Sequence, residues 1–426
     1  MTAFHADYAW VGGGVTRDVR LDVEAGRFTA VTAGGSVEDA TRLPGLVLPG
    51  LANVHSHAFH RALRGRTHTG RGSFWTWREQ MYALAGTLDP DRYLALARAV
   101  YGEMALAGVT CVGEFHYLHH GPGGVPYRDP NAMGHALIEA ARQAGIRITL
   151  LDTLYLTSTV DGAPLEGVQR RFGDRDVDAW RSRIAAVRPA AHARPGAAAH
   201  SIRGVPASVL DGLPGDGPLH IHLSEQRAEN EQCLAVHGCT PTELLHRHGV
   251  LGPHTTAVHA THLTDDDIKT LGGTGTGVCL CPTTERDLAD GIGPARALAD
   301  AGSPLSLGSD SHAVIDLIEE ARAVELDERL ATERRGWFTS AELLAAAANH
   351  AALGWDDAGA LAAGNRADLV AVRLDSVRTA GIDPAQAVFA ATAADVTHVV
   401  ADGRTIVADG RHTGFDVAAA LREVLT

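Results

Sequence analysis

Apolar and polar positions follow a regular order between residue 51 and about residue 345. Eight short apolar runs, typical of buried strands, are separated by segments with the spacing of amphipathic helices. The runs cover residues 51–57, 109–116, 147–155, 197–202, 219–223, 256–260, 277–281 and 305–310. Eight strands that alternate with helices predict a (β/α)8 TIM-like barrel, in which the active site lies at the carboxyl ends of the strands.

Helix signals fall in the gaps between these runs. Asp89 followed by Pro90 is typical of a helix start, and apolar positions recur at helical spacing from Tyr93 to Met104. Thr240 and Thr264 are each placed to begin a later helix, because a threonine hydroxyl can accept a hydrogen bond from an unpaired backbone N–H group.

The two ends of the chain differ from its middle. Residues 1–48 and 365–413 contain short β-like runs broken by glycine, and neither piece alone can bury one face of a sheet. We therefore expect a small β-sandwich domain made from both ends, residues 1–50 and 351–426, beside a barrel of residues 51–350. A chain of 426 residues is long enough for one large and one small domain.

Composition limits the kinds of partner. A net charge of −14 argues against nucleic acid and against an anionic membrane, and the sequence has no apolar stretch that approaches the roughly 20 residues of a membrane span. The N-terminus lacks the features of a signal peptide, and the five cysteines lack paired zinc-knuckle spacing. We expect a cytoplasmic protein that acts on a small molecule, and a homodimer as its assembly.

Metal-binding side chains stand at the ends of several runs. His55 and His57 close the first run and share a face, because alternate residues of a strand point the same way. His222 closes another run, and Asp310 closes the last. Imidazoles and one carboxylate from separate strands are the ligands of an open catalytic Zn²⁺ site. We predict one Zn²⁺ per chain, with Fe²⁺ as the alternative metal.

Catalytic groups are expected next to these ligands. Glu225, three residues after His222, is placed to transfer a proton to a leaving group. His259, at the end of the sixth run, would polarise the atom under attack, and Asp310 would take the proton of the attacking water. We expect His116, His119 and His120 to line the pocket and to form supporting hydrogen bonds, not to bind a second metal ion.

Two segments at the borders of the barrel resemble the amidohydrolase superfamily. They are PGLVLPGLANVHSH at residues 44–57 and GNRADLV at residues 364–370. That resemblance covers nearly the whole chain and implies a metal-dependent barrel enzyme. No lysine occurs between residues 58 and 268, so the bridging lysine of two-metal members is missing. The resemblance therefore points to the one-metal deaminase branch.

Within this branch, further segments resemble the formimidoylglutamate deiminases of bacterial histidine degradation. They are SFWTWRE at 73–79, EFHY at 114–117, HH at 119–120, GVQRRF at 167–172, HSIR at 200–203 and DGI at 290–292. The resemblance implies hydrolysis of N-formimidoyl-L-glutamate to N-formyl-L-glutamate and ammonia. By the same resemblance, the substrate would be held by His60, which replaces a glutamine of the relatives, and by Arg78, Tyr117, His200 and Arg203.

Two arginines in an acidic protein also suit a small dicarboxylate substrate on physical grounds, because a guanidinium binds a carboxylate through two parallel hydrogen bonds. For Arg78, the alternative is a cation–π contact with Trp75 or Trp77. The alternatives for the whole protein are a related deaminase that acts on an aromatic amine such as guanine, and a metal-free barrel that only binds.

Overall fold

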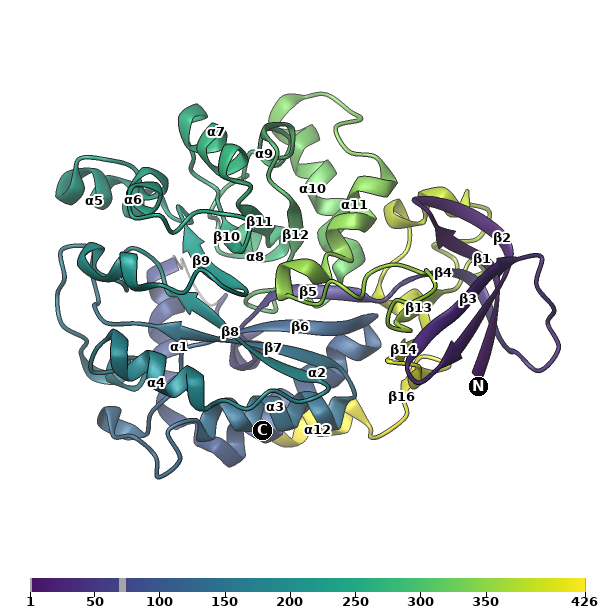
Figure 1. The fold of residues 1–426 in the computed structure, drawn as a ribbon, viewed down its shortest axis with the longest axis horizontal. Coiled ribbons are helices and arrows are strands. Elements are labelled where there is room, and N and C mark those ends of the chain that lie inside the picture. Colours follow the sequence, from purple (N-terminus) through teal and green to yellow (C-terminus); the bar gives the residue numbers. More distant parts are fainter. Residues whose placement is uncertain (1, 69–73, 426) are drawn as a thin grey trace.

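A computed structural model describes residues 2–68 and 74–425 and shows a barrel beside a separate sheet (Figure 1). Ser73, the first residue of the segment 73–79 discussed above, lies outside the described residues.

The barrel strands confirm the predicted order. They run parallel, each paired with its neighbour in sequence, as β5 (Leu51–Ser56), β6 (Val109–His116), β7 (Arg147–Leu154), β8 (Ala193–Ala199), β9 (Leu219–Leu223), β10 (Thr255–His259), β11 (Gly277–Leu280) and β12 (Leu305–Leu307). Six strands match the predicted ranges to within one residue at each end, and two differ by more. The strand β8 begins earlier, at Ala193 before the less apolar Arg194-Pro195-Gly196, and ends at Ala199, while β12 ends at Leu307, three residues before Asp310.

Closure of the barrel depends on residues next to the predicted metal ligands. The first and last strands meet at a parallel bridge between Ser56 and Asp310. The Asp310 backbone N–H donates to the His55 carbonyl at 3.0 Å, and the His57 N–H donates to the Asp310 carbonyl at 3.2 Å. The junction between the first and last barrel strands therefore lies at the predicted metal site.

Helices cover the barrel and connect its strands (Figure 1). They are α1 (Phe74–Thr87), α2 (Pro90–Leu106), α3 (Ala132–Ala144), α4 (Val177–Ala186), α5 (Arg227–His237), α6 (Pro241–Arg247), α7 (Asp265–Thr274), α8 (Pro282–Asp287), α9 (Ala295–Ala301), α10 (Leu317–Thr332), α11 (Ser340–Ala347) and α12 (Val417–Leu425). Asp89, Thr240 and Thr264 cap α2, α6 and α7 as predicted, each accepting a hydrogen bond from a backbone N–H group three residues on.

Both chain ends build the second sheet, as expected. Hydrogen bonds join eight strands in the order β16-β15-β14-β13-β4-β1-β2-β3. The strands are β1 (Thr2–Val11), β2 (Gly14–Glu24), β3 (Arg27–Ala33), β4 (Thr41–Pro49), β13 (Leu369–Val372), β14 (Val396–Ala401), β15 (Arg404–Ala408) and β16 (Arg411–His412). The strand β4 pairs with both β1 and β13, so it joins the two ends, while α12 returns to pack against α2 of the barrel.

A buried ion-pair network connects this sheet to the base of the barrel. Arg147, the first residue of β7, pairs with Asp368 and, at 3.0 Å, with Asp402. Its guanidinium also lies 5.1 Å from the centre of the buried Trp355 ring. The side chains of Arg147 and Asp368 are each only 1% exposed, so the pair lies in a low-dielectric environment.

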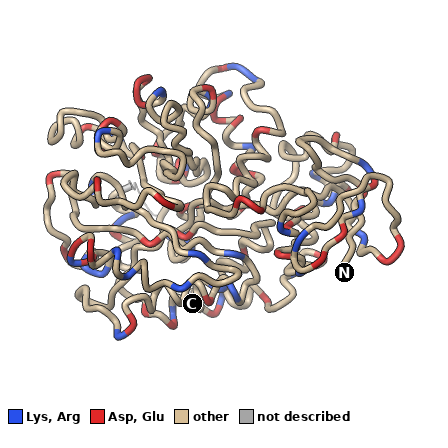
Figure 2. The backbone as a smooth tube through the Cα atoms, viewed as in Figure 1, with Lys and Arg blue, Asp and Glu red and all other residues tan. Residues whose placement is uncertain are grey.

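Charged residues of both signs are interspersed over the described backbone (Figure 2). This mixture fits a small-molecule partner better than a nucleic acid, which needs a concentrated basic surface. Among the described residues, no helix has the length and apolar character needed to cross a membrane. All five cysteines are buried and free of disulfides.

Candidate active site

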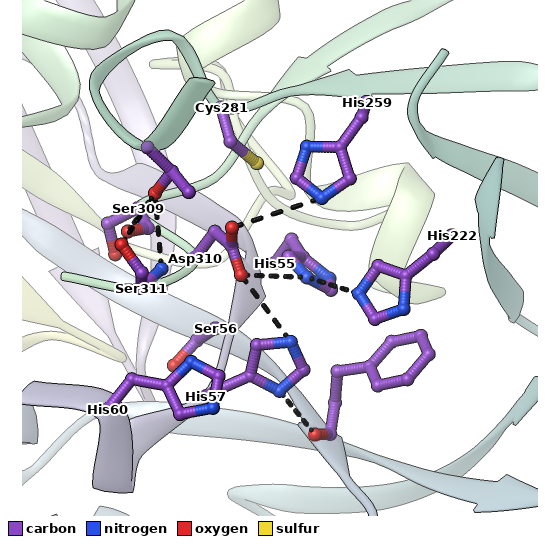
Figure 3. A network of polar contacts seen from close by, with 12 residues as sticks. His55, Ser56, His57, His60, His222, His259, Cys281, Ser309, Asp310 and Ser311 are labelled. Atoms are coloured by element: carbon purple, nitrogen blue, oxygen red, sulfur yellow. Dashed lines mark hydrogen bonds and ion pairs between the residues drawn. The ribbon is translucent and has the colours of Figure 1, made fainter. Parts of the chain in front are cut away.

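The four predicted ligands converge on one point at the carboxyl ends of β5, β9 and β12 (Figure 3). Nε2 of His55 lies 3.1 Å from Nε2 of His222 and 3.3 Å from Oδ1 of Asp310, and the same oxygen lies 3.4 Å from Nε2 of His57. Zn–N bonds of about 2.0–2.1 Å place neighbouring tetrahedral ligands ~3.4 Å apart. These three distances match those between neighbouring ligands of a divalent metal ion, and His55 belongs both to a possible ligand group with His57 and Asp310 and to one with His222 and His259.

Surrounding groups hold the histidines in the form that binds a metal. Nδ1 of His57 donates to the Phe115 carbonyl at 2.9 Å, and Nδ1 of His222 donates to the His200 carbonyl at 2.8 Å. Each Nε2 is therefore left with a free lone pair. Burial also lowers the pKa of His55 and His222 and brings the pKa of His57 to about 3, so these rings are neutral at physiological pH.

The backbone leaves the strands through strained turns at this site. Ser224, His259, Ala260, Asp310 and His312 all have positive φ, between 40° and 68°. A non-glycine residue in this region costs on the order of 1–3 kcal/mol, and such residues gather at functional sites. The turns direct Asp310 and His259 toward the same point (Figure 3).

A close approach behind the metal site explains Gly308. A Cβ atom at this position would lie 2.7 Å from Cβ of His55 and 2.8 Å from its carbonyl oxygen. Any side chain would separate β5 from β12, so glycine is required by the contact itself.

Glu114 supports the segment that carries two ligands. Its buried carboxylate accepts hydrogen bonds from the Ser56 hydroxyl and the Ala58 N–H, both at 2.7 Å. His312 contacts the same hydroxyl at 3.2 Å through Nε2 and Ser309 Oγ at 2.9 Å through Nδ1. These contacts fix the backbone on both sides of His57. Burial raises the pKa of Glu114 to about 7.

The predicted catalytic groups surround the open side of the metal site. Nε2 of His259 lies 3.8 Å from Oε1 of Glu225 and 3.9 Å from Oδ2 of Asp310, while its Nδ1 faces Glu285 at 3.4 Å. Burial alone would lower the pKa of His259, but the carboxylates of Glu225, Glu285 and Asp310 outweigh burial and raise it. Burial raises the pKa of Glu225, whose carboxyl group lies beside the candidate metal site.

One cavity opens above these groups, and it includes every residue that was predicted to hold the substrate. Its lining is His57, His60, Trp77, Arg78, Met81, Tyr82, Tyr117, Tyr155, Ser158, Phe172, His200, Arg203, His222, Glu225, His259, Leu288 and Asp310. His55 lies beneath this surface and is fully buried.

The substrate-side residues have distinct surroundings. His60 Nε2 is 2.8 Å from the Tyr117 hydroxyl, and the His200 ring lies 4.2 Å from that of Tyr155. The Arg78 guanidinium lies 4.4 Å from the centre of Trp75, so the cation–π contact considered above is present in a side chain that also lines the cavity. Arg203 is already paired, with Glu225 at 3.6 Å and Glu229 at 3.1 Å.

The expectation that His116, His119 and His120 line the pocket is wrong, because none of them borders the cavity. Residues on β6 alternate in direction, so Phe115 contacts His55 while His116 faces Tyr93 of α2. His119 does form a supporting hydrogen bond, to the Thr153 carbonyl at 2.9 Å.

Sequence reasoning missed Glu229 and Glu285, two buried carboxylates of the site. Each lies in the first turn of a helix that directly follows a barrel strand. That position after β9 and β11 is a weak signal in the sequence, because α7 and α10 also begin with acidic residues.

Comparisons with known proteins agree with this geometry. The sequence profile of the amidohydrolase family matches residues 46–406. A formimidoylglutamate deiminase of Pseudomonas aeruginosa is 36% identical, over 98% of this chain and 97% of its own. An 8-oxoguanine deaminase of the same species is 30% identical, over 94% and 92%.

Solved structures show the same fold. A crystal structure of an amidohydrolase from Brucella melitensis has a TM-score of 0.91 and 32% identity, covering 100% of this chain and 99% of that one. A zinc complex of atrazine chlorohydrolase from Arthrobacter aurescens, 22% identical, has a TM-score of 0.89 and covers both chains completely. The family and the donor set support a divalent metal ion at this site. The chain belongs to the amidohydrolase family.

Proposed function

We propose that this protein hydrolyses N-formimidoyl-L-glutamate to N-formyl-L-glutamate and ammonia, as a step of histidine degradation, with one Zn²⁺ per chain. The enzyme is a hydrolase of C–N bonds by its family and by its likeness to a formimidoylglutamate deiminase. The choice of Zn²⁺ over Fe²⁺, the homodimer and the cytoplasmic location stay predictions from the sequence.

The observation that carries the proposal is the charge distribution of the cavity. Its lining contains the cationic side chains of Arg78 and Arg203 together with the acidic side chains of Glu225 and Asp310, and Arg203 lies 3.6 Å from Glu225. The proposed substrate carries the complementary charges, with two carboxylates on the glutamyl part and a cationic amidine at the reacting end. A substrate with this polarity would place its reacting carbon beside the metal site.

A divalent ion held by His55, His57, His222 and Asp310 would act as a Lewis acid and make a water molecule acidic near neutral pH. Asp310 would accept a proton from the attacking water while the water oxygen bonds to the formimidoyl carbon. Glu225 would carry a proton to the terminal nitrogen, the bond between carbon and that nitrogen would break, and ammonia would leave. His259 would orient the reacting group through Nε2.

An aromatic amine is the second candidate substrate. Aromatic side chains make up much of the cavity wall, and flat rings are held by stacking on such side chains. These residues are Trp77, Tyr82, Tyr117, Tyr155 and Phe172. The arginines favour the dicarboxylate, because neutral guanine offers them no carboxylate to bind.

Ammonia release from the metal-loaded enzyme tests the proposal directly. N-formimidoyl-L-glutamate should be turned over with a kcat/KM at least 100-fold above that for guanine or 8-oxoguanine. Detection of N-formylglutamate, and not of formamide with glutamate, would identify the bond that breaks. Faster turnover of a purine would contradict the proposal and favour the second candidate.

A further inference from the structure

Glu229 stands out among the buried carboxylates because it touches both ends of the candidate site. It lies in the first turn of α5, which follows β9 (Figure 1), and only 1% of it is exposed. Its Oε2 is 3.1 Å from Nε of Arg203, and its Oε1 accepts a hydrogen bond from the Ser224 N–H at 3.3 Å. It is not part of the cavity lining itself.

The first contact controls how Arg203 faces the cavity. The ion pair lies on the Nε side of the guanidinium, without a well-aligned hydrogen bond between Nε and Oε2, and Nη2 lies 3.6 Å from Oε2 of Glu225 on the side of the reacting groups. A carboxylate of a ligand that binds Arg203 must therefore approach through the Nη atoms. Burial would lower the pKa of Arg203, but Glu229 and Glu225 outweigh burial and raise it, so the arginine stays charged.

The second contact reaches the turn that carries Glu225. Ser224 has a φ of 50°, an unfavourable conformation for a non-glycine residue, and it directly precedes Glu225. The Glu229 carboxylate accepts the N–H of this strained residue, so it holds the turn in place. One buried group thus connects the anion-binding side chain to the proton-transferring side chain.

We propose that Glu229 sets the distance between the carboxylate-binding Arg203 and the reacting groups, and thereby selects the chain length of the acyclic dicarboxylate substrate. The inference rests on the proposed function, because it assigns to Arg203 the side-chain carboxylate of the substrate, whose distance from the amidine changes with chain length. Glu229 is a positioning residue that acts through Arg203 and through the Ser224 turn. A glutamyl substrate would match the fixed distance, and the aspartyl homologue, one methylene shorter, would not.

The test compares N-formimidoyl-L-glutamate with N-formimidoyl-L-aspartate in wild-type enzyme and in Glu229→Gln. One methylene in a hydrophobic pocket is worth roughly 10–200-fold in kcat/KM, and we take this as the scale for a site that fixes both ends of its substrate. The wild type should prefer the glutamyl substrate by a factor in this range. In Glu229→Gln the preference should fall at least 10-fold, mainly through a higher KM for the glutamyl substrate, while metal content stays at one ion per chain.

Glu231→Gln is the matched control, since it makes the same chemical change two residues further along α5 at an exposed position. It should leave the preference for the glutamyl substrate unchanged.

Glu229→Asp keeps the charge but withdraws the carboxylate by one methylene, so it should also weaken the preference. This variant replaces Glu229→Gln in the test if Glu229→Gln does not fold. A folded, metal-loaded Glu229 variant with the wild-type preference would overturn the inference. Failure of the wild type to act on either substrate would instead overturn the proposed function.

Discussion

At the scale of single residues, Glu225 can be tested as the proton carrier separately from the metal ligands. Glu225 is buried and faces His259 at 3.8 Å, but it is not one of the four proposed metal ligands. Glu225→Gln keeps the size of the side chain and removes its ability to carry a proton. We expect kcat for ammonia release to fall by roughly 10²–10⁴, with the metal content by elemental analysis unchanged. Wild-type activity in this variant would exclude Glu225 as the proton carrier.

Residue-scale features were predictable where they follow strand ends. His55, His57, His222 and Asp310 each end an apolar run, and parallel strands bring such ends together. Glu229 and Glu285 could not be chosen in the same way, because many helices begin with an acidic residue and only tertiary packing decides which one faces the site. For His116, the alternation of side chains along β6 was the decisive information, and it directs this ring away from His55.

The segment after β12 approaches β5 closely at Gly308. Gly308→Ala would place a methyl group 2.7 Å from Cβ of His55, so one strand must move. We expect metal affinity, measured by competition with a chelator, to fall about 10–100-fold, and the free energy of unfolding to fall by about 1–3 kcal/mol.

Gly273→Ala on α7 is the control for this change, because its added methyl group would meet no atom within 4 Å. Alanine is also the better helix former, so this variant should be neutral or slightly stabilised. Unchanged metal affinity in Gly308→Ala would show that β5 and the segment after β12 can separate without disturbing the proposed metal ligands.

Element boundaries followed the apolar pattern where a strand is buried on both faces. The barrel strands fit this description, whereas β8 begins in a segment with arginine and proline that has no apolar pattern. The apolar run of β4 continues directly into β5, with only Gly50 between them. A continuous run does not reveal that the chain leaves one sheet and enters another at this point.

At the scale of the whole molecule, the barrel and the terminal sheet are joined by the buried pair of Arg147 and Asp368. Removing one partner of a buried pair leaves the other charge uncompensated, which typically costs 3–5 kcal/mol. Asp368→Asn should therefore lower the free energy of unfolding, measured with urea, by about this amount. At urea concentrations below the unfolding transition, the kcat of Asp368→Asn should stay near that of the wild type. The reason is that Arg147 begins β7, at the end of the barrel away from the active site.

Asp375→Asn is the comparison for this variant, since Asp375 pairs with Arg373 on the surface and is 75% exposed. Exposed pairs contribute roughly 0–1 kcal/mol, so this change should have little effect. Equal effects of the two substitutions would mean that the buried pair does not hold the barrel to the terminal sheet.

The closure of the barrel through Ser56 and Asp310 also orders events during synthesis of the protein. His55 and His57 leave the ribosome long before Asp310 does, and at ~5–20 residues per second the interval is roughly 10–50 s. During that time β5 has no partner on one edge, and two of the four ligands are absent or unplaced. The nascent chain therefore cannot hold its ion fully until the last barrel strand has emerged. Complete binding of the ion therefore has to follow the emergence of Asp310, and a chain that stops before Gly308 would remain an open sheet with an exposed edge.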